Sequence, residues 1–141
     1  MRLTTKIILV LAAILAVWNT ESSAKKKNKP KSNIQGAVYM FGFASSFNDS
    51  TVYFTDIQQL DSVYFERKTK FLLDRDNYSY QLRDYLASVG EEHRTCVVSY
   101  ATDRKKIEKK FLKMRKKYLS KKGYLLKYLK TEEFAFEAIP Q

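Results

Sequence analysis

The residues that could carry out catalysis are few and scattered. The chain has one histidine, His93, and one cysteine, Cys96. A serine hydrolase would use His93 as the base for a serine, but no G-x-S-x-G turn surrounds the serines considered, which are Ser45, Ser46 and Ser99. A Cys96–His93 pair is disfavoured, because residues an odd number of positions apart on one strand point to opposite faces. Cys96 lies in the apolar stretch RTCVVSY, which favours a small buried side chain over a reactive thiol.

Metal and phosphate chemistry also lack their usual residue sets. A zinc site takes several His or Cys ligands, and this chain has one of each. The short run 74–77 offers oxygen ligands around an arginine, which favours a turn over a calcium loop. Glycine occurs at four scattered positions, without a phosphate-binding loop. No spacing selects a glycosidase pair among the carboxylates Asp56, Asp61, Glu66, Glu91 and Glu92. We therefore predict no cofactor and no metal.

The strongest chemical pattern is positive charge on a predicted helix over residues 103–122. Four apolar residues recur at spacings of four, three and four and form one stripe, with Leu112 and Leu119 beside it: Ile107, Phe111, Met114 and Tyr118. Gly123 predicts a Schellman motif at the end of the helix. Lysines cover the opposite face, with Glu108 as the only acid inside the helix. The candidate anion-binding residues are Lys105, Lys106, Lys109, Lys113, Lys116 and Lys117.

This lysine face has two interpretations. Neighbouring like charges cost a few tenths of a kcal/mol per pair. Either the face is simply solvated and this cost is tolerated, or an anionic partner offsets the cost. A net charge of +11 suits phosphate, anionic polysaccharide or anionic lipid. Aromatic residues on predicted strands (Phe41, Phe43 and Tyr53) resemble an RNA-stacking surface. The simpler interpretation places these residues in the core, and predicted export makes nucleic acid the least favoured partner.

The N-terminus predicts export. Residues 1–24 combine a short basic start, an apolar run over 7–18 and a polar end in Ser-Ser-Ala, which is typical of a signal peptide. The alternative is an uncleaved anchor, but the run is shorter than the ~20 residues of a spanning helix. Residues 25–34 read as a basic disordered linker and 35–141 as a single domain. We expect a periplasmic or extracellular protein with no transmembrane span after cleavage.

The elements that would position the lysine face follow from periodicity. We predict, in order, strands 36–47 and 51–57, helices 62–73 and 77–89, strand 95–101, helix 103–122 and strand 132–139. Residues 124–130 are ambiguous and suit a short helix. Both parities of 36–47 are apolar, which suggests a central strand covered on both sides, and Gly42 within it suggests a bulge or a close backbone approach. The order ββααβαβ predicts an α+β fold, with a mostly antiparallel four-stranded sheet and helices packed on one face.

The stretch FASSFNDSTVYFT, with the later KFL, YSYQL and RTCVV segments, resembles small exported proteins of unknown function from Gram-negative gut-type bacteria. That resemblance implies an envelope or secreted location and supplies no activity. We expect a non-enzymatic binding or structural module of the cell envelope that contacts an anionic partner, polymer or lipid, through its lysine-rich helix. The alternatives are a small secreted hydrolase and a homo-oligomeric subunit that pairs through the aromatic hairpin over 36–57.

Overall fold

The computed structural model describes residues 33–141, and these form an α+β domain with a mixed five-stranded sheet and two helices. The predicted fold class is therefore confirmed, whereas the predicted signal peptide and nearly all of the predicted linker lie outside the described residues. The elements in chain order are β1 (Ile34–Ser45), β2 (Thr51–Thr55), β3 (Gln58–Phe65), α2 (Arg75–Ser88), β4 (Thr95–Ala101), α3 (Arg104–Ser120) and β5 (Leu125–Leu129).

Strand β1 is the centre of the sheet and pairs antiparallel with β2, β3 and β4. Tyr39 pairs with both Gln59 of β3 and Ala101 of β4, so those two strands lie on opposite edges of β1. Phe43 likewise pairs with both β2 and β4. Strands β2 and β3 therefore follow one another along a single edge of β1. Strand β5 then adds to β2 in parallel, which makes the sheet mixed.

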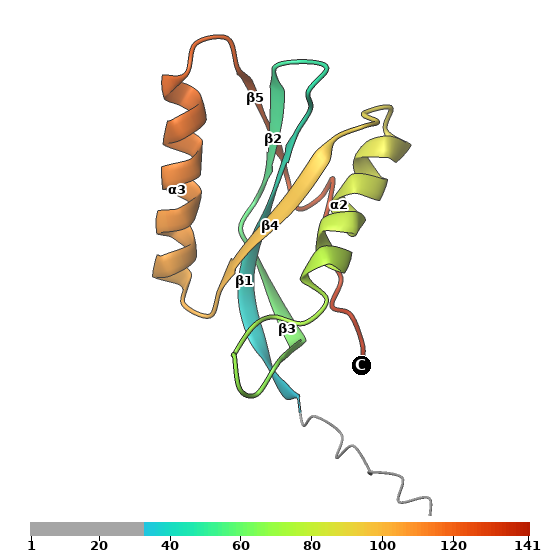
Figure 1. The fold of residues 1–141 in the computed structure, drawn as a ribbon, viewed down its shortest axis with the longest axis vertical. Helices are drawn as coiled ribbons and strands as arrows, with labels where there is room; N and C mark the ends of the chain where they lie inside the picture. The colour runs from blue at the N-terminus through green and yellow to red at the C-terminus, as the bar shows by residue number, and fades with distance from the viewer. Residues whose placement is uncertain (1–32) are drawn as a thin grey trace, which may run out of the picture. The chain divides into compact units, whose positions relative to one another are not determined.

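The two helices cover opposite faces of this sheet (Figure 1). Val38 and Met40 of β1 belong to the core under α2, whereas Phe41 and Phe43 belong to the core under α3. The prediction that the helices pack on one face is wrong, and so is the prediction of a four-stranded sheet. The apolar residues on both parities of β1 are the physical reason, because each parity needs its own cover. Coverage on both sides, as expected for a central strand, is confirmed.

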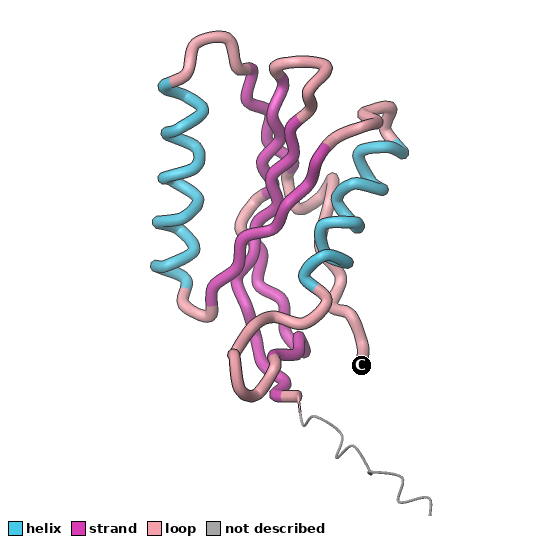
Figure 2. Tube along the Cα trace, in the orientation of Figure 1, coloured by secondary structure: helices cyan, strands magenta, loops and turns pink. Residues whose placement is uncertain are grey.

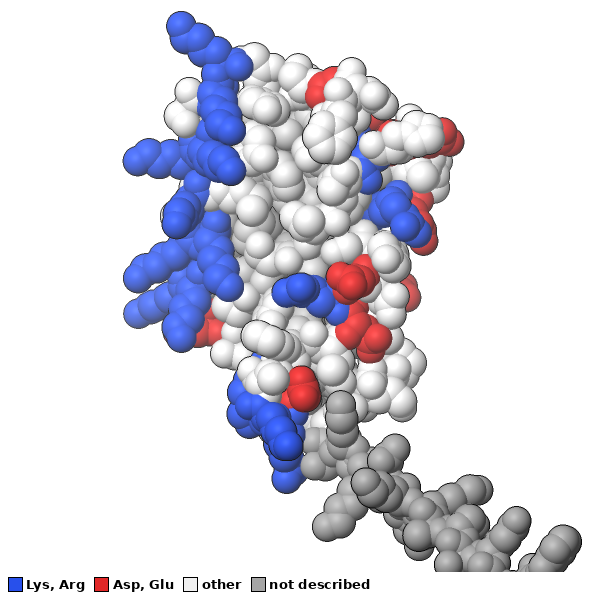
Figure 3. Space-filling view, in the orientation of Figure 1, with Lys and Arg blue, Asp and Glu red and all other residues white. Residues whose placement is uncertain are grey.

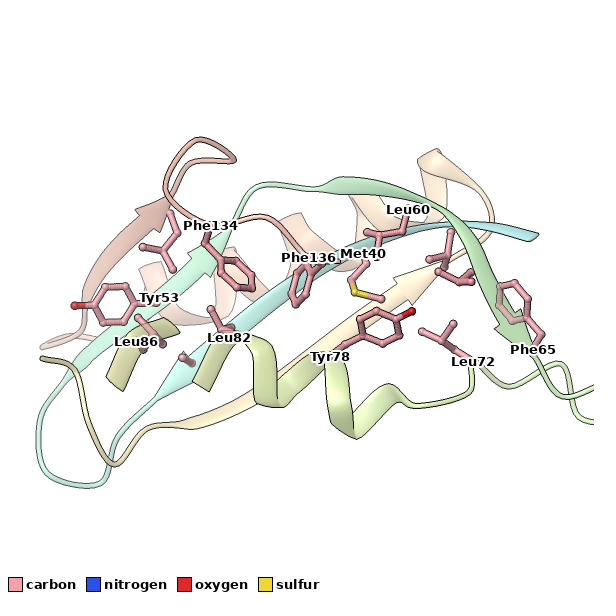
Figure 4. Packing of buried hydrophobic residues seen from close by; sticks show 14 residues of the cluster. Met40, Tyr53, Leu60, Phe65, Leu72, Tyr78, Leu82, Leu86, Phe134 and Phe136 are labelled. Atoms are coloured by element: carbon pink, nitrogen blue, oxygen red, sulfur yellow. The ribbon is translucent and has the colours of Figure 1, made fainter. Parts of the chain in front are cut away.

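The core under α2 is closed by the C-terminal segment as well as by the helix. Tyr78 of α2 lies opposite Met40, and Leu82 of the same helix lies beside Phe134 and Phe136 of the C-terminal segment (Figure 4). All five side chains are buried. This face of the sheet is therefore shielded by one helix and by a chain end without regular secondary structure.

Gly42 allows the close packing at the middle of β1. A Cβ atom there would lie 2.6 Å from Leu82 Cδ2 and 3.0 Å from Phe136 Cζ. The backbone N–H of Gly42 donates to Thr55 Oγ1 at 2.8 Å, in a buried hydrogen bond that substitutes for a ladder bond where β2 gives way to β3. The sequence interpretation of this glycine as a close backbone approach is confirmed.

The predicted helix over 62–73 is wrong. Residues 58–65 form β3, and Phe65 pairs with Ile34 at the start of β1. Ser62 has a φ of 59°, and the pairing register shifts opposite Gly36 to Val38, so a bulge breaks the regular alternation. That bulge hides the strand period, and the large residues after it match a helical spacing by chance. The remaining residues to 74 form turns and an isolated bridge.

The last two predicted elements are also corrected. The ambiguous stretch 124–130, which suits a short helix, contains strand β5, and the predicted strand 132–139 contains no strand (Figure 2). Side-chain amides replace a neighbouring strand there. Gln58 donates to Phe134 O at 2.9 Å and accepts from Phe136 N at 2.7 Å. Gln81 makes the same reciprocal pair with Glu137, both bonds at 2.9 Å. The observed order is thus βββαβαβ.

Candidate anion-binding face

Helix α3 forms where its charge pattern and apolar stripe predict it. Asp103 caps the start, its Oδ1 accepting from Lys105 N at 2.8 Å. Ile107 is buried, and the Phe111 ring packs edge-on to Phe41 with 5.1 Å between centroids. The helix ends at Ser120 with extended backbone at Lys121, so the cap is not the expected Schellman motif.

Beyond that stripe, the exposed surface of α3 divides into three sides. At about 100° per residue, Lys105, Lys109 and Lys116 point directly away from the sheet. Lys106, Lys110, Lys113 and Lys117 lie on the side nearer β4. Leu112 and Leu119 lie on the side nearer β5, beside Arg115. The six predicted lysines therefore divide into three that point outward and three that face the β4 side.

The β4 side of α3 borders a groove of about 480 Å³. Three lysines line it together with uncharged residues. The lysines are Lys110, Lys113 and Lys117, and the uncharged residues are Ser99, Met114 and Tyr118. Lys110 Nζ also donates to Tyr100 O of β4 at 2.9 Å, which ties the helix to that strand. Two predicted lysines, Lys113 and Lys117, thus lie at a concave surface, and Lys110 belongs with them although it is not among the predicted site residues.

None of the α3 lysines forms an ion pair within the described residues. The ion pairs in residues 33–141 involve arginine and histidine as the cations, and the one on this helix joins Arg104 to Glu108 at 3.0 Å. Lys117 and Lys121 lie over the ring of Tyr118 instead, at 5.7 and 5.6 Å from its centroid. Lysine and arginine side chains project in a continuous row along the α3 edge of the domain (Figure 3). Such a surface is ready to accept an anion without first breaking an ion pair.

Sequence reasoning missed Arg94, which joins three parts of the chain and whose side chain is 3 % exposed. Its guanidinium donates to Asp49 at 2.9 Å, to Glu91 at 2.8 Å and to Thr51 O at 2.8 Å, and it lies over the Tyr53 ring. A single arginine in a polar connector gives no periodic signal. Because its donors are used within the fold, Arg94 serves the structure rather than a ligand.

The acids around Arg94 titrate below their ordinary range. A hydrogen bond from Thr51 N–H is the main cause of the lowered pKa of Asp49, and Arg94 adds to it. The hydrogen bond from Arg94 is the main cause of the lowered pKa of Glu91. Both carboxylates therefore stay charged and paired at neutral pH.

The candidate catalytic residues are not brought into a site. The His93 side chain is 79 % exposed, and its one ionic neighbour within residues 33–141 is Glu92, at 3.8 Å. Cys96 packs against the core under α2, and burial raises the pKa of its thiol to about 11. A protonated, half-buried thiol is a poor nucleophile at neutral pH. The prediction of an ordinary packed cysteine agrees with this environment.

A second hollow, of about 660 Å³, lies where α2 begins. Asp74 precedes the helix in left-handed backbone, and its carboxylate accepts from Asn77 and from Gln141. Within residues 33–141, no three His, Cys, Asp or Glu side chains gather as a metal site would need. No helix in the same part of the chain has the length and hydrophobicity to cross a bilayer.

Comparison with known proteins assigns no relative. No protein-family model, curated protein or solved structure matches the chain. The lysine face and the surfaces beside it are therefore the features of this protein that bear on function.

Proposed function

We propose that this protein is an exported, non-enzymatic binding module of the cell envelope that holds an anionic partner through α3. One observation carries the proposal. The lysines of α3 share an exposed face on which, within the described residues, no acid pairs with them. Keeping these charges adjacent costs free energy in the isolated protein, and an anionic partner would recover it.

The groove beside β4 strengthens the proposal, since it gives the charge a shape. Lys106, Lys110, Lys113 and Lys117 follow one another at spacings of three or four residues, which is about one helical turn each. At a rise of about 1.5 Å per residue they cover roughly 16 Å along the helix axis. A row of this kind suits successive phosphate, carboxylate or headgroup charges. The apolar floor of Met114 and Tyr118 suits the carbon atoms between those charges.

The export part of the proposal depends on residues 1–24. Expression of the full chain in a bacterial host, followed by mass spectrometry of the protein recovered from the envelope or medium, tests it. The expected mass is that of a processed chain that begins near residue 25. An unprocessed chain retained in the cytoplasm would contradict both the leader and the envelope location.

Charge reversal tests the binding part. The exported form is titrated with long-chain polyphosphate and with vesicles of phosphatidylglycerol, at several salt concentrations. Lys109→Glu, Lys113→Glu and Lys116→Glu together should abolish binding, and binding by the unaltered protein should weaken steeply with salt. The matched control carries the same charge change away from α3, at Lys68, Lys70 and Lys130. Equal losses in the two variants would show that net charge, and not this face, attracts the anion.

A further inference from the structure

The side of α3 nearer β5 differs from the rest of the helix. Leu112 and Leu119 are each 57 % exposed, and they lie two turns apart on the same side of the helix. Their neighbours on the outward side are lysines. A solvated helix face gains nothing from leucine here, since the core stripe is complete without these two residues.

Residues of β5 and of the loop before it extend this apolar surface. Tyr128 is 44 % exposed, and Arg115 Nε donates to its hydroxyl at 2.8 Å, which holds the ring beside the helix. Tyr124 is 41 % exposed and packs edge-on to Tyr118, with 5.1 Å between centroids. Two leucines and two tyrosines therefore share one flank. We refer to Leu112, Leu119, Tyr124 and Tyr128 as the α3–β5 flank.

The flank and the lysines together have the composition of a membrane-interface surface. Leucine contributes apolar area. Tyrosine suits the boundary between hydrocarbon and water, because its ring is apolar and its hydroxyl is polar. Lysine reaches anionic headgroups from an apolar stem. The outward lysines Lys105, Lys109 and Lys116 lie beside the leucines along the same helix. We propose that the anionic partner is a phospholipid bilayer, and that α3 lies along its surface with the α3–β5 flank entering the headgroup boundary.

Other occupants fit the flank less well. A second copy of this domain would place two lysine faces close together, and like charges repel across such an interface. A linear polyanion would use the lysines but gain nothing from exposed leucines. Only a surface that is both anionic and apolar uses both parts. The inference rests on the proposed function, because the lysines supply the attraction that brings the flank to the bilayer.

The test separates the apolar contribution from the electrostatic one. The exported form is sedimented with vesicles of phosphatidylglycerol and phosphatidylethanolamine in equal parts, and separately titrated with polyphosphate. The test variant is Leu112→Gln with Leu119→Gln, since glutamine is polar and nearly as good a helix former as leucine. The matched control replaces two exposed apolar residues of the α2 side, Phe71→Gln and Val89→Gln.

We expect the leucine variant to lose about tenfold or more in vesicle affinity, while its polyphosphate affinity stays unchanged. The control should bind both probes like the unaltered protein. A second measurement uses Leu119→Trp, where the emission of the introduced tryptophan should shift to the blue on anionic vesicles and be quenched by brominated acyl chains.

Several results would overturn the inference. Full vesicle binding by the leucine variant, or an introduced tryptophan whose emission does not respond to vesicles, would remove the flank from the contact. Polyphosphate binding without vesicle binding would leave the proposed function standing and refute the bilayer. Failure of the unaltered protein to bind either probe would refute the proposed function itself.

Discussion

Replacing Gln58 by leucine should destabilise the domain far more than the same replacement at Gln81. Both side chains make two reciprocal hydrogen bonds to the C-terminal segment, at 2.7–2.9 Å. They differ in access to water, because Gln58 is 7 % exposed whereas the bonds of Gln81 lie at the surface. The pair therefore isolates the effect of burial on one bonding pattern.

The size of each loss in the free energy of unfolding follows from the backbone groups that the substitution leaves without a partner. In Gln58→Leu, the carbonyl of Phe134 and the N–H of Phe136 lose their partners in a water-poor site. Each unsatisfied group costs about 1–3 kcal/mol, so the loss in the free energy of unfolding should be roughly 2–6 kcal/mol. In Gln81→Leu, water can take over both bonds to Glu137, and a loss of about 1 kcal/mol or less is expected.

Urea unfolding followed by circular dichroism measures both free energies on the same scale. Losses that agree within about 0.5 kcal/mol would refute the argument from burial, because the two variants delete the same bonds. Gln58→Glu gives an independent check. Its carboxylate would face the carbonyl of Phe134, whereas a protonated carboxyl donates to it. Burial raises the folded pKa of such a group, so this variant should be most stable below the ordinary pKa of about 4.3 and lose stability as pH rises from there through the raised folded pKa.

Two further predictions concern the sheet centre and the arginine cluster. Gly42→Ala should cost about 1–3 kcal/mol by forcing the new Cβ against Leu82, and an unchanged urea midpoint would show that the helix yields freely. Because Thr51 N–H and Arg94 lower the folded pKa of Asp49, its stabilising effect is present above the ordinary pKa of about 3.9 and is lost as pH falls below it. Asp49→Asn should therefore flatten the acid side of the stability profile, and parallel profiles for the two proteins would contradict this.

Much of the fold could be predicted because several elements have a strong period. Both parities of β1 are apolar, which requires cover on both faces, and the three- and four-residue spacing in α2 and α3 requires burial on one side. These apolar residues do pack into the two cores. β3 could not be predicted in the same way. Its bulge at Ser62 breaks the alternation, and its strand state is set by pairing with β1, a partner that lies earlier in the chain.

The C-terminal segment shows a different limit of sequence reasoning. Phe134 and Phe136 are buried, as their alternation predicts, since alternation reports which side chains avoid water. Alternation does not report which groups satisfy the backbone. Here the amides of Gln58 and Gln81 do so, and neither stands out in a sequence pattern.

For the site, the sequence is sufficient to identify the lysine-bearing helix but not its surroundings. Helical geometry alone separates Lys109 from Lys113 by angle. Only the topology shows that one side of the helix meets β4, where Lys110 lines a groove, and that the other side meets Tyr128 of β5. Leu112 and Leu119 lie beside the apolar stripe in the sequence pattern, yet both are exposed, because they lie outside the part of the helix that packs on the sheet.

The long reach of Gln58 has a consequence for when the domain folds. Its partners Phe134 and Phe136 lie 76 and 78 positions further along the chain, and β2 likewise pairs with the distant β5. Contacts of such separation close large loops, which slows folding, and these contacts cannot form before residues 134–136 have been synthesised. Until then the core under α2 lacks Phe134 and Phe136, which help to close it. Late closure of this kind would suit the export proposed above, in which the polypeptide crosses a membrane before it folds.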